Sequence, residues 1–176
     1  MQKKILVFLF IKIFIVSTIA HSAEDVTQIF AQGMAAFKAD ELDKAITTFK
    51  SVIKTEPDFV DAHYHLGLSY YRKAKFGQAI TSLKRTLELL PRDLDVWIKL
   101  GMAYYKKGDF GQAVKAYQEA IKIEPNNIEV LNNLGMAYDE LSRFDEAIAV
   151  YQFALKIHPD HPQIRSNLSI AEDLKS

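Results

Sequence analysis

The chain has 176 residues, of which 22 are basic, 22 are acidic, 49% are hydrophobic and none is cysteine. The charge balance excludes the strongly basic surface that non-specific nucleic-acid binding requires. The lack of cysteine excludes disulfides, thiolate metal sites and a lipid attached through a cysteine.

Residues 1–22 have the layout of a secretory signal peptide. Lys3 and Lys4 precede an almost continuously apolar stretch that is interrupted by Lys12 and followed by small residues. The 16 residues from Ile5 to Ala20 are fewer than the roughly 20 that span a bilayer. We expect cleavage after Ser22 or after Ala20, with an uncleaved membrane anchor as the alternative; both place the remaining chain outside the cytoplasm. Removing the three lysines from the 22 basic residues leaves 19 against 22 acidic residues, a net charge of −3.

A repeat of 34 residues organises the rest of the chain, because four prolines recur at that interval. They are Pro57, Pro91, Pro125 and Pro159, and they define units at 26–59, 60–93, 94–127 and 128–161. Such self-similarity predicts stacked units, each of which buries its apolar face against its neighbours. No linker-like run separates the units, so one domain is expected.

Each unit reads as two amphipathic helices, most clearly in unit three. Apolar residues recur at helical spacing from Val96 to Tyr105 and again from Phe110 to Ile121. Gly108 between them suits the left-handed residue that ends a helix. Pro125 ends the second helix, because proline cannot continue the backbone hydrogen-bond ladder.

Small residues in phase predict close contacts between the two helices of a unit. Glycine in mid-helix costs about 1 kcal/mol relative to alanine, so four in phase indicate an approach that a side chain would block. The glycines are Gly33, Gly67, Gly101 and Gly135; Ala45, Ala79, Ala113 and Ala147 form a second small set, and Phe49, Leu83, Tyr117 and Tyr151 are the large partners.

The two ends of the array depart from the pattern. Unit one has Ala36 where the other units have tyrosine, as is common for a terminal repeat. Residues 162–176 read as a capping helix that covers the last unit, with Asp160 expected to help to start it.

The fullest unit resembles the tetratricopeptide repeat. Its motif residues are Trp97, Leu100, Gly101, Tyr104, Ala113, Tyr117, Ala120 and Pro125. The resemblance implies an all-α protein: a right-handed α-solenoid of four helix–turn–helix units plus a C-terminal capping helix. With the N-terminal segment, it suggests an exported bacterial member of that family.

In that family the first helix of every unit lines a concave groove that holds partner peptides. The resemblance therefore implies groove positions at Phe30, Met34, Phe37, Tyr64, Leu68, Tyr71, Arg72, Ile98, Met102, Tyr105, Lys106, Asn132 and Met136. The ninth positions are all Met or Leu, which either form an adaptable apolar binding surface or thicken the core between units. Lys38, Arg72 and Lys106 form a basic ladder that stops at Asp139 and Glu140.

The family's carboxylate clamp for cytosolic chaperone tails is not expected here. It uses lysine and asparagine where this chain has Phe30 and Met34. A helix or an extended segment with an apolar stripe and an acidic flank would suit the groove better.

No constellation of catalytic residues is found, so the chain is not expected to be an enzyme. His63 and His65 point apart on a helix, and His63 takes the position that Trp97 occupies in unit three, which favours packing. His158 and His161 flank a turn proline and have no nearby carboxylate except Asp160, which does not favour a metal site. No phosphate loop or G-x-S-x-G elbow is present, and no metal or other cofactor is expected.

We therefore expect a non-catalytic protein–protein interaction scaffold of the cell envelope, periplasmic or secreted, that binds a peptide or helix of a partner. The alternative is a self-associating oligomeric scaffold, membrane-anchored if the N-terminal segment is uncleaved. No nucleic-acid partner is expected.

Overall fold

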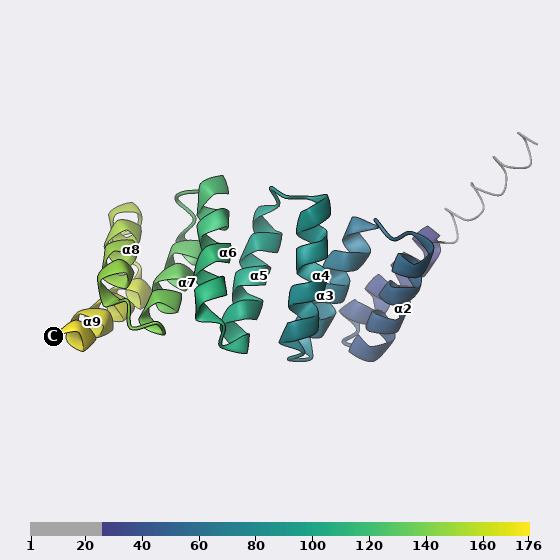
Figure 1. Ribbon diagram of the computed structural model, residues 1–176, viewed down its shortest axis with the longest axis horizontal. Helices are drawn as coiled ribbons and strands as arrows, with labels where there is room; N and C mark the ends of the chain where they lie inside the picture. The colour runs from purple at the N-terminus through teal and green to yellow at the C-terminus, as the bar shows by residue number, and fades with distance from the viewer. Residues whose placement is uncertain (1–25) are drawn as a thin grey trace, which may run out of the picture.

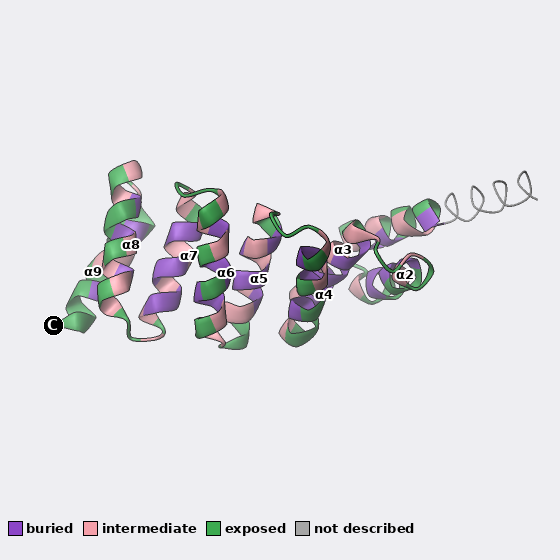
Figure 2. Ribbon diagram, turned by 45° about the horizontal axis from the view of Figure 1, so that its top comes forward, coloured by how far each residue is buried: buried purple, intermediate pink, exposed green. Residues whose placement is uncertain are grey.

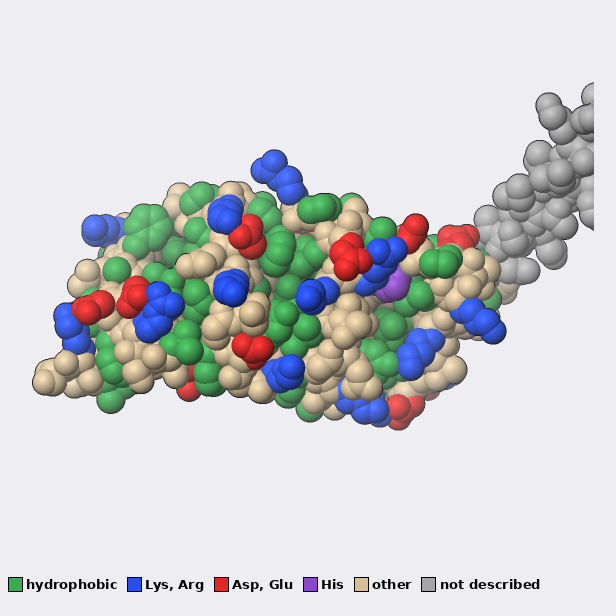
Figure 3. Space-filling model, viewed as in Figure 1, with side chains coloured by type: hydrophobic (Ala, Val, Ile, Leu, Met, Phe, Trp, Pro, Cys, Tyr) green, Lys and Arg blue, Asp and Glu red, His purple; other side chains and the backbone are tan. Residues whose placement is uncertain are grey.

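The computed structural model describes residues 26–176, and all regular elements in that range are α-helices. A first helix is described from residue 26 to residue 38. The others are α2 (Leu42–Thr55), α3 (Val60–Arg72), α4 (Phe76–Leu89), α5 (Leu94–Lys107), α6 (Phe110–Ile123), α7 (Ile128–Asp139), α8 (Phe144–Ile157) and α9 (Pro162–Lys175). They form a single row of antiparallel pairs (Figure 1), and basic, acidic and hydrophobic side chains are interspersed on the face seen in that view (Figure 3). The predicted all-α solenoid is confirmed; the predicted signal peptide lies outside the described residues.

The first helices of the units lie on the inner side of the curved row. From α2 onward, every helix packs against the next one in the chain, and α3, α5, α7 and α9 also contact one another in succession. Within residues 26–176, the second helices α2, α4, α6 and α8 make no such contacts with each other. Because the first helices are closer together, they line the concave face, and the second helices form the convex face.

The core runs along the row where successive helices face one another (Figure 2). Its largest fully buried side chains include Phe49, Leu83, Tyr117 and Tyr151, one from the second helix of each unit. Each faces the glycine of its own unit. A Cβ atom added to Gly33 would lie 2.7 Å from the Phe49 side chain, and one added to Gly67 would lie 2.9 Å from Leu83. The corresponding distances at Gly101 and Gly135 are shorter still. The predicted close approach at the four glycines is confirmed.

The turn within each unit contains one residue with positive φ at the same repeat position. It is Gly108 (φ 83°) in unit three, as predicted, but Asp40 (φ 61°), Ala74 (φ 54°) and Ser142 (φ 56°) elsewhere. The N–H of the following residue bonds the carbonyl five residues back, as Asp109 does to Tyr104 at 2.9 Å. This is the Schellman pattern that ends a helix with a left-handed residue.

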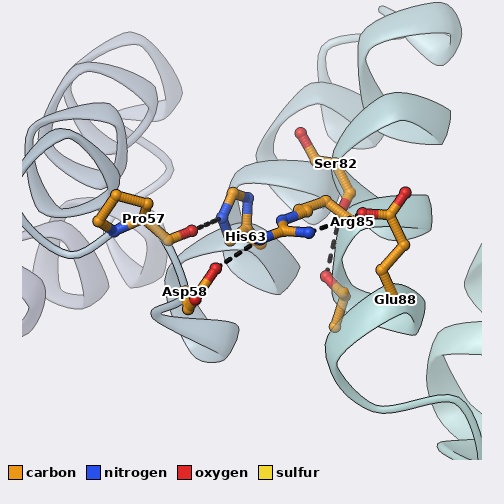
Figure 4. A network of polar contacts seen from close by, with 7 residues as sticks. Pro57, Asp58, His63, Ser82, Arg85 and Glu88 are labelled. Carbon is orange, nitrogen blue, oxygen red and sulfur yellow. Dashed lines mark hydrogen bonds and ion pairs between the residues drawn. The ribbon is translucent and has the colours of Figure 1, made fainter.

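The turns between units are tied to the next helix through the proline carbonyl. His63 Nε2 lies 2.7 Å from the Pro57 oxygen, and Trp97 Nε1 donates to the Pro91 oxygen at 2.9 Å. Arg165 makes the same bond to Pro159 at 2.8 Å. Figure 4 shows the first of these bonds beside the ion pairs of Arg85. His63 is 9% exposed, so it packs and anchors a turn.

The C-terminal helix α9 covers the last unit. Ile164 and Ala171 are completely buried where α9 packs against α8. The side chain that caps its N-terminus is His161, whose Nδ1 accepts from the Ile164 N–H at 3.4 Å. Asp160, which was predicted to help to start the helix, instead pairs with Arg165 at 3.3 Å.

Candidate functional site

The predicted groove residues lie on the first helices, but only some of them converge on one hollow. We call it the inner pocket, a cavity of about 160 Å³ lined by Tyr71, Met102, Tyr105, Lys106, Tyr117, Asn133 and Met136. Helices α3, α5 and α7 supply its sides, and Tyr117 reaches it from α6. The two methionines come from the same repeat position in successive units, where their thioethers are half-buried.

The inner pocket contains two residues that sequence reasoning did not assign to the groove. Tyr117 was predicted to pack against Gly101, and it does so while one part of it borders the pocket. Asn133 occupies a sixth repeat position, next to the predicted Asn132. Helical spacing places the sixth and ninth positions on neighbouring stripes, which is the signal that could have identified it.

The acidic end of the groove is bonded to tyrosine hydroxyls. Tyr105 Oη donates to Glu140 at 2.8 Å, and burial, together with this bond, raises the pKa of Tyr105 to about 12. Tyr151 Oη donates to Asp139 Oδ2 at 2.7 Å. Asp139 Oδ1 is buried without a hydrogen-bond partner, and burial raises the pKa of this carboxyl above its usual range.

The basic ladder differs from the sequence pattern at Arg72. Its guanidinium pairs with Asp40 at 2.7 Å, bonds the Phe37 carbonyl at 3.0 Å and lies 4.9 Å from the Phe37 ring centre. Arg72 therefore joins unit two to unit one and is largely neutralised. Among residues 26–176, neither Lys38 nor Lys106 has an ion-pair partner. Of the two, Lys106 borders the inner pocket.

Several other predicted residues serve contacts away from the inner pocket. Tyr64 donates to Asp95 and lines a separate, more polar hollow. Ile98 is 6% exposed and belongs to the core. Asn132 accepts from Asn167 of α9 at 3.0 Å, which ties the last unit to the cap.

The first unit contributes aromatic packing. Phe30 lies with its ring centre 5.7 Å from Phe49 and 5.0 Å from Phe59. Met34, Phe37 and Leu68 are half-buried. His65 is surrounded by Phe30, Phe37, Phe49 and Tyr64, and its Nδ1 has no hydrogen-bond partner. Burial lowers the pKa of His65.

A second and larger hollow lies between the second helices α4 and α6. We call it the outer groove, a cavity of about 390 Å³ whose lining includes Trp97 and Tyr104. Sequence reasoning treated both residues only as motif positions. In the described part of the chain, no group of three histidine or acidic side chains is arranged to hold a metal ion, and no helix has the length and apolarity needed to cross a bilayer.

The stacked helix pairs and their concave groove define a repeat scaffold of the α-solenoid class, which presents extended surfaces for binding proteins. Sequence models described as TPR repeat and tetratricopeptide repeat together match residues 33–92 and 101–161. The chain belongs to the tetratricopeptide repeat family and is a protein–protein interaction scaffold. Members of this fold are typically non-catalytic.

Solved structures of tetratricopeptide proteins have the same fold. A crystal structure of MamA is 26% identical, covers 87% of this chain and 84% of its own, and has a TM-score of 0.82. A second MamA structure is 26% identical, covers 81% of this chain and 84% of its own, and has a TM-score of 0.77. YrrB, described as a TPR protein with an unusual peptide-binding site, is 19% identical, with 91% and 82% coverage and a TM-score of 0.78. A search of curated proteins found no match.

Proposed function

We propose that this scaffold holds a peptide or helix of a partner protein in its concave groove, with the inner pocket as the main anchor. The observation that supports this best is the convergence of Met102, Met136 and Tyr105 on one cavity, with the unpaired ammonium of Lys106 beside it. Methionine side chains adapt to ligands of different shape. A flexible apolar anchor next to a single cation is suited to recognising a short segment.

The chemistry of the pocket supports one class of ligand. Its volume of about 160 Å³ accommodates one apolar side chain, and Lys106 complements a carboxylate close to that side chain in the ligand. We therefore propose an acidic amphipathic segment whose apolar residue enters the pocket and whose carboxylate faces Lys106.

We further propose that the protein acts in the cell envelope, as a periplasmic or secreted chain. The support is the order of positive, apolar and small residues in positions 1–22. Cell fractionation, combined with determination of the mature N-terminus, tests this. A chain that keeps Met1 and stays in the cytoplasm would contradict the location but leave the groove proposal intact.

The experiment for the groove is photo-crosslinking from position 102 in cells, with identification of the adduct by mass. A single foreign protein is the expected product. Met34 is the matched control, because it occupies the same repeat position and is also half-buried but does not line the inner pocket. A probe at position 34 should therefore give little or none of that adduct.

The binding energy is tested with Met102→Glu, which places a carboxylate in an apolar cavity beside the acidic flank of the ligand. We expect the adduct captured by a probe at position 136 to disappear, while circular dichroism stays near that of the parent. Met34→Glu should keep the adduct. If Met102→Glu unfolds the chain, or if both variants still bind, the methionines serve packing and the proposal is wrong.

A further inference from the structure

The outer groove differs from the two equivalent places in the array. The repeat position of Tyr104 is occupied by Tyr70 in unit two and by Tyr138 in unit four, and both are 6% exposed. The ammonium of Lys50 lies 5.7 Å from the Tyr70 ring centre. Arg143 lies 4.7 Å from the Tyr138 ring, whose hydroxyl accepts from Gln118 at 3.0 Å. The chain thus covers these two tyrosines with its own side chains.

Tyr104 is not covered in this way. It is half-buried, and in the described range it has neither a cation over its ring nor a hydrogen bond to its hydroxyl. The residue that corresponds to Arg143 is Asp109, which cannot form a cation–π contact. Trp97 is half-buried as well, whereas Leu131, at the same position of the next unit, is 3% exposed. The result is an open aromatic floor between α4 and α6.

The charges that remain unpaired around this floor are positive. The two glutamates that line the groove are already paired, Glu88 with Arg85 at 2.7 Å and Glu119 with Lys122 at 2.5 Å. Lys84 on α4 and Lys115 on α6 also line it, and neither has an ion-pair partner in residues 26–176. An apolar segment with acidic neighbours complements this surface.

Such a segment lies at the C-terminal end of the same chain. Ile170 and Leu174 are 52% and 59% exposed, and their spacing of four places them on one face of α9. Asp173, which borders that face, is exposed and has no ion-pair partner among the described residues, whereas Glu172 projects from the opposite side of the helix. Ile170 occupies the ninth repeat position, as Met136 does in unit four.

We propose that α9 of one copy docks in the outer groove of a second copy. Ile170 and Leu174 then contact Trp97 and Tyr104, and Asp173 faces Lys84 and Lys115. Donor and acceptor surfaces are different, so the contact is head-to-tail and adds copies in a row rather than closing a symmetric dimer. Because two side chains form a small contact, the association is weak. This contact uses the convex face and leaves the concave groove available to a partner protein.

Disulfide trapping tests this directly, because the full chain contains no cysteine. The donor chain carries Ser169→Cys, which keeps Ile170 and Leu174, and the acceptor chain carries Gln112→Cys at the groove. Mild oxidation of the mixed full-length chains should give a product of twice the 20.0 kDa chain mass. Gln78→Cys is the control acceptor, because it occupies the same repeat position above the groove that Lys50 covers; we expect little dimer from it.

Charge exchange tests the specificity of the contact. Lys84→Glu with Lys115→Glu in the acceptor should lower the dimer yield several-fold, and Asp173→Lys in the donor should restore it. Ile170→Ser with Leu174→Ser should abolish the dimer. Equal yields from positions 112 and 78, or no dimer in any pairing, would each overturn the proposal. None of these outcomes depends on client binding at Met102.

Discussion

The left-handed turn position provides a reciprocal test of backbone strain. Gly108 and Ala74 occupy equivalent places, with φ of 83° and 54°, yet only glycine adopts that region without a steric penalty. We expect Gly108→Ala to destabilise the fold and Ala74→Gly to stabilise it. Space does not complicate the first change, since a Cβ at residue 108 would meet no atom within 4 Å.

The magnitude follows from two opposing terms. A left-handed L residue costs about 1–2 kcal/mol in the native state. Replacing alanine by glycine also raises the conformational entropy of the unfolded chain, which lowers the free energy of unfolding by about 0.4–1 kcal/mol and so offsets part of the relieved penalty. The free energy of unfolding should therefore rise by about 0.5–1 kcal/mol for Ala74→Gly and fall by a similar amount for Gly108→Ala. For a domain of this size, the corresponding shift in Tm is about 2–4 °C per kcal/mol.

Urea unfolding followed by far-UV circular dichroism measures both variants against the parent. The double variant should return close to the parental stability, because the two turns share no partner and distant changes add. If both single changes shift stability in the same direction, the penalty is not set by the sign of φ and the reasoning is refuted. If Ala74→Gly alone destabilises, the Ala74 methyl group makes a contribution that outweighs the strain.

Three further predictions concern the core, pH and the cap. Gly135→Ala brings a Cβ within 3 Å of the Tyr151 ring and should cost about 1–3 kcal/mol, whereas Gly111→Ala meets open space and should stabilise α6 by about 0.5–1 kcal/mol in the same urea assay. Burial lowers the pKa of His65 in the folded state, so the unfolded chain binds more protons than the folded chain as pH drops below the usual histidine pKa of about 6.5. The free energy of unfolding should therefore fall as pH drops through that value. Urea midpoints measured across this pH range should show the loss of stability in the parent chain but not the part due to His65 in the His65→Leu variant. Deleting residues 162–176 uncovers the surface that Ile164 buries, so light scattering should detect aggregation; a monomeric truncation of equal stability would contradict the capping role.

The fold could be predicted because each repeat position carries its own physical constraint. Glycine opposite a large side chain indicates a helix crossing, and proline at a fixed interval indicates the turn between units. The same logic found Gly108, since glycine is the usual left-handed residue. It could not find Ala74 or Ser142, because nothing in these side chains signals positive φ. Their conformation is imposed by the helices packed on both sides of the turn.

The candidate site was predictable in outline only. The repeat phase identified the first-helix stripe, yet only part of that stripe borders the inner pocket, because Ile98 and Asn132 are taken up by packing and by α9. The outer groove depends on a missing partner: Tyr104 is open because Asp109 stands where Arg143 covers the equivalent tyrosine. Such an absence becomes visible only when the units are superimposed in space.

The charge of the groove shows why repeat positions cannot be interpreted one at a time. Arg72 and Lys106 occupy the same position in successive units, but Arg72 is neutralised by Asp40 of the preceding unit. One unit further on, Ala74 occupies the position of Asp40, and its side chain has no carboxylate that could form an ion pair. Lys106 therefore stays available beside the inner pocket. Whether a cation joins two units or faces a ligand is therefore decided by the turn residue 32 positions earlier. In this chain, that difference leaves one usable positive charge where the apolar pocket is also found, and the two together define the acidic amphipathic ligand that we propose.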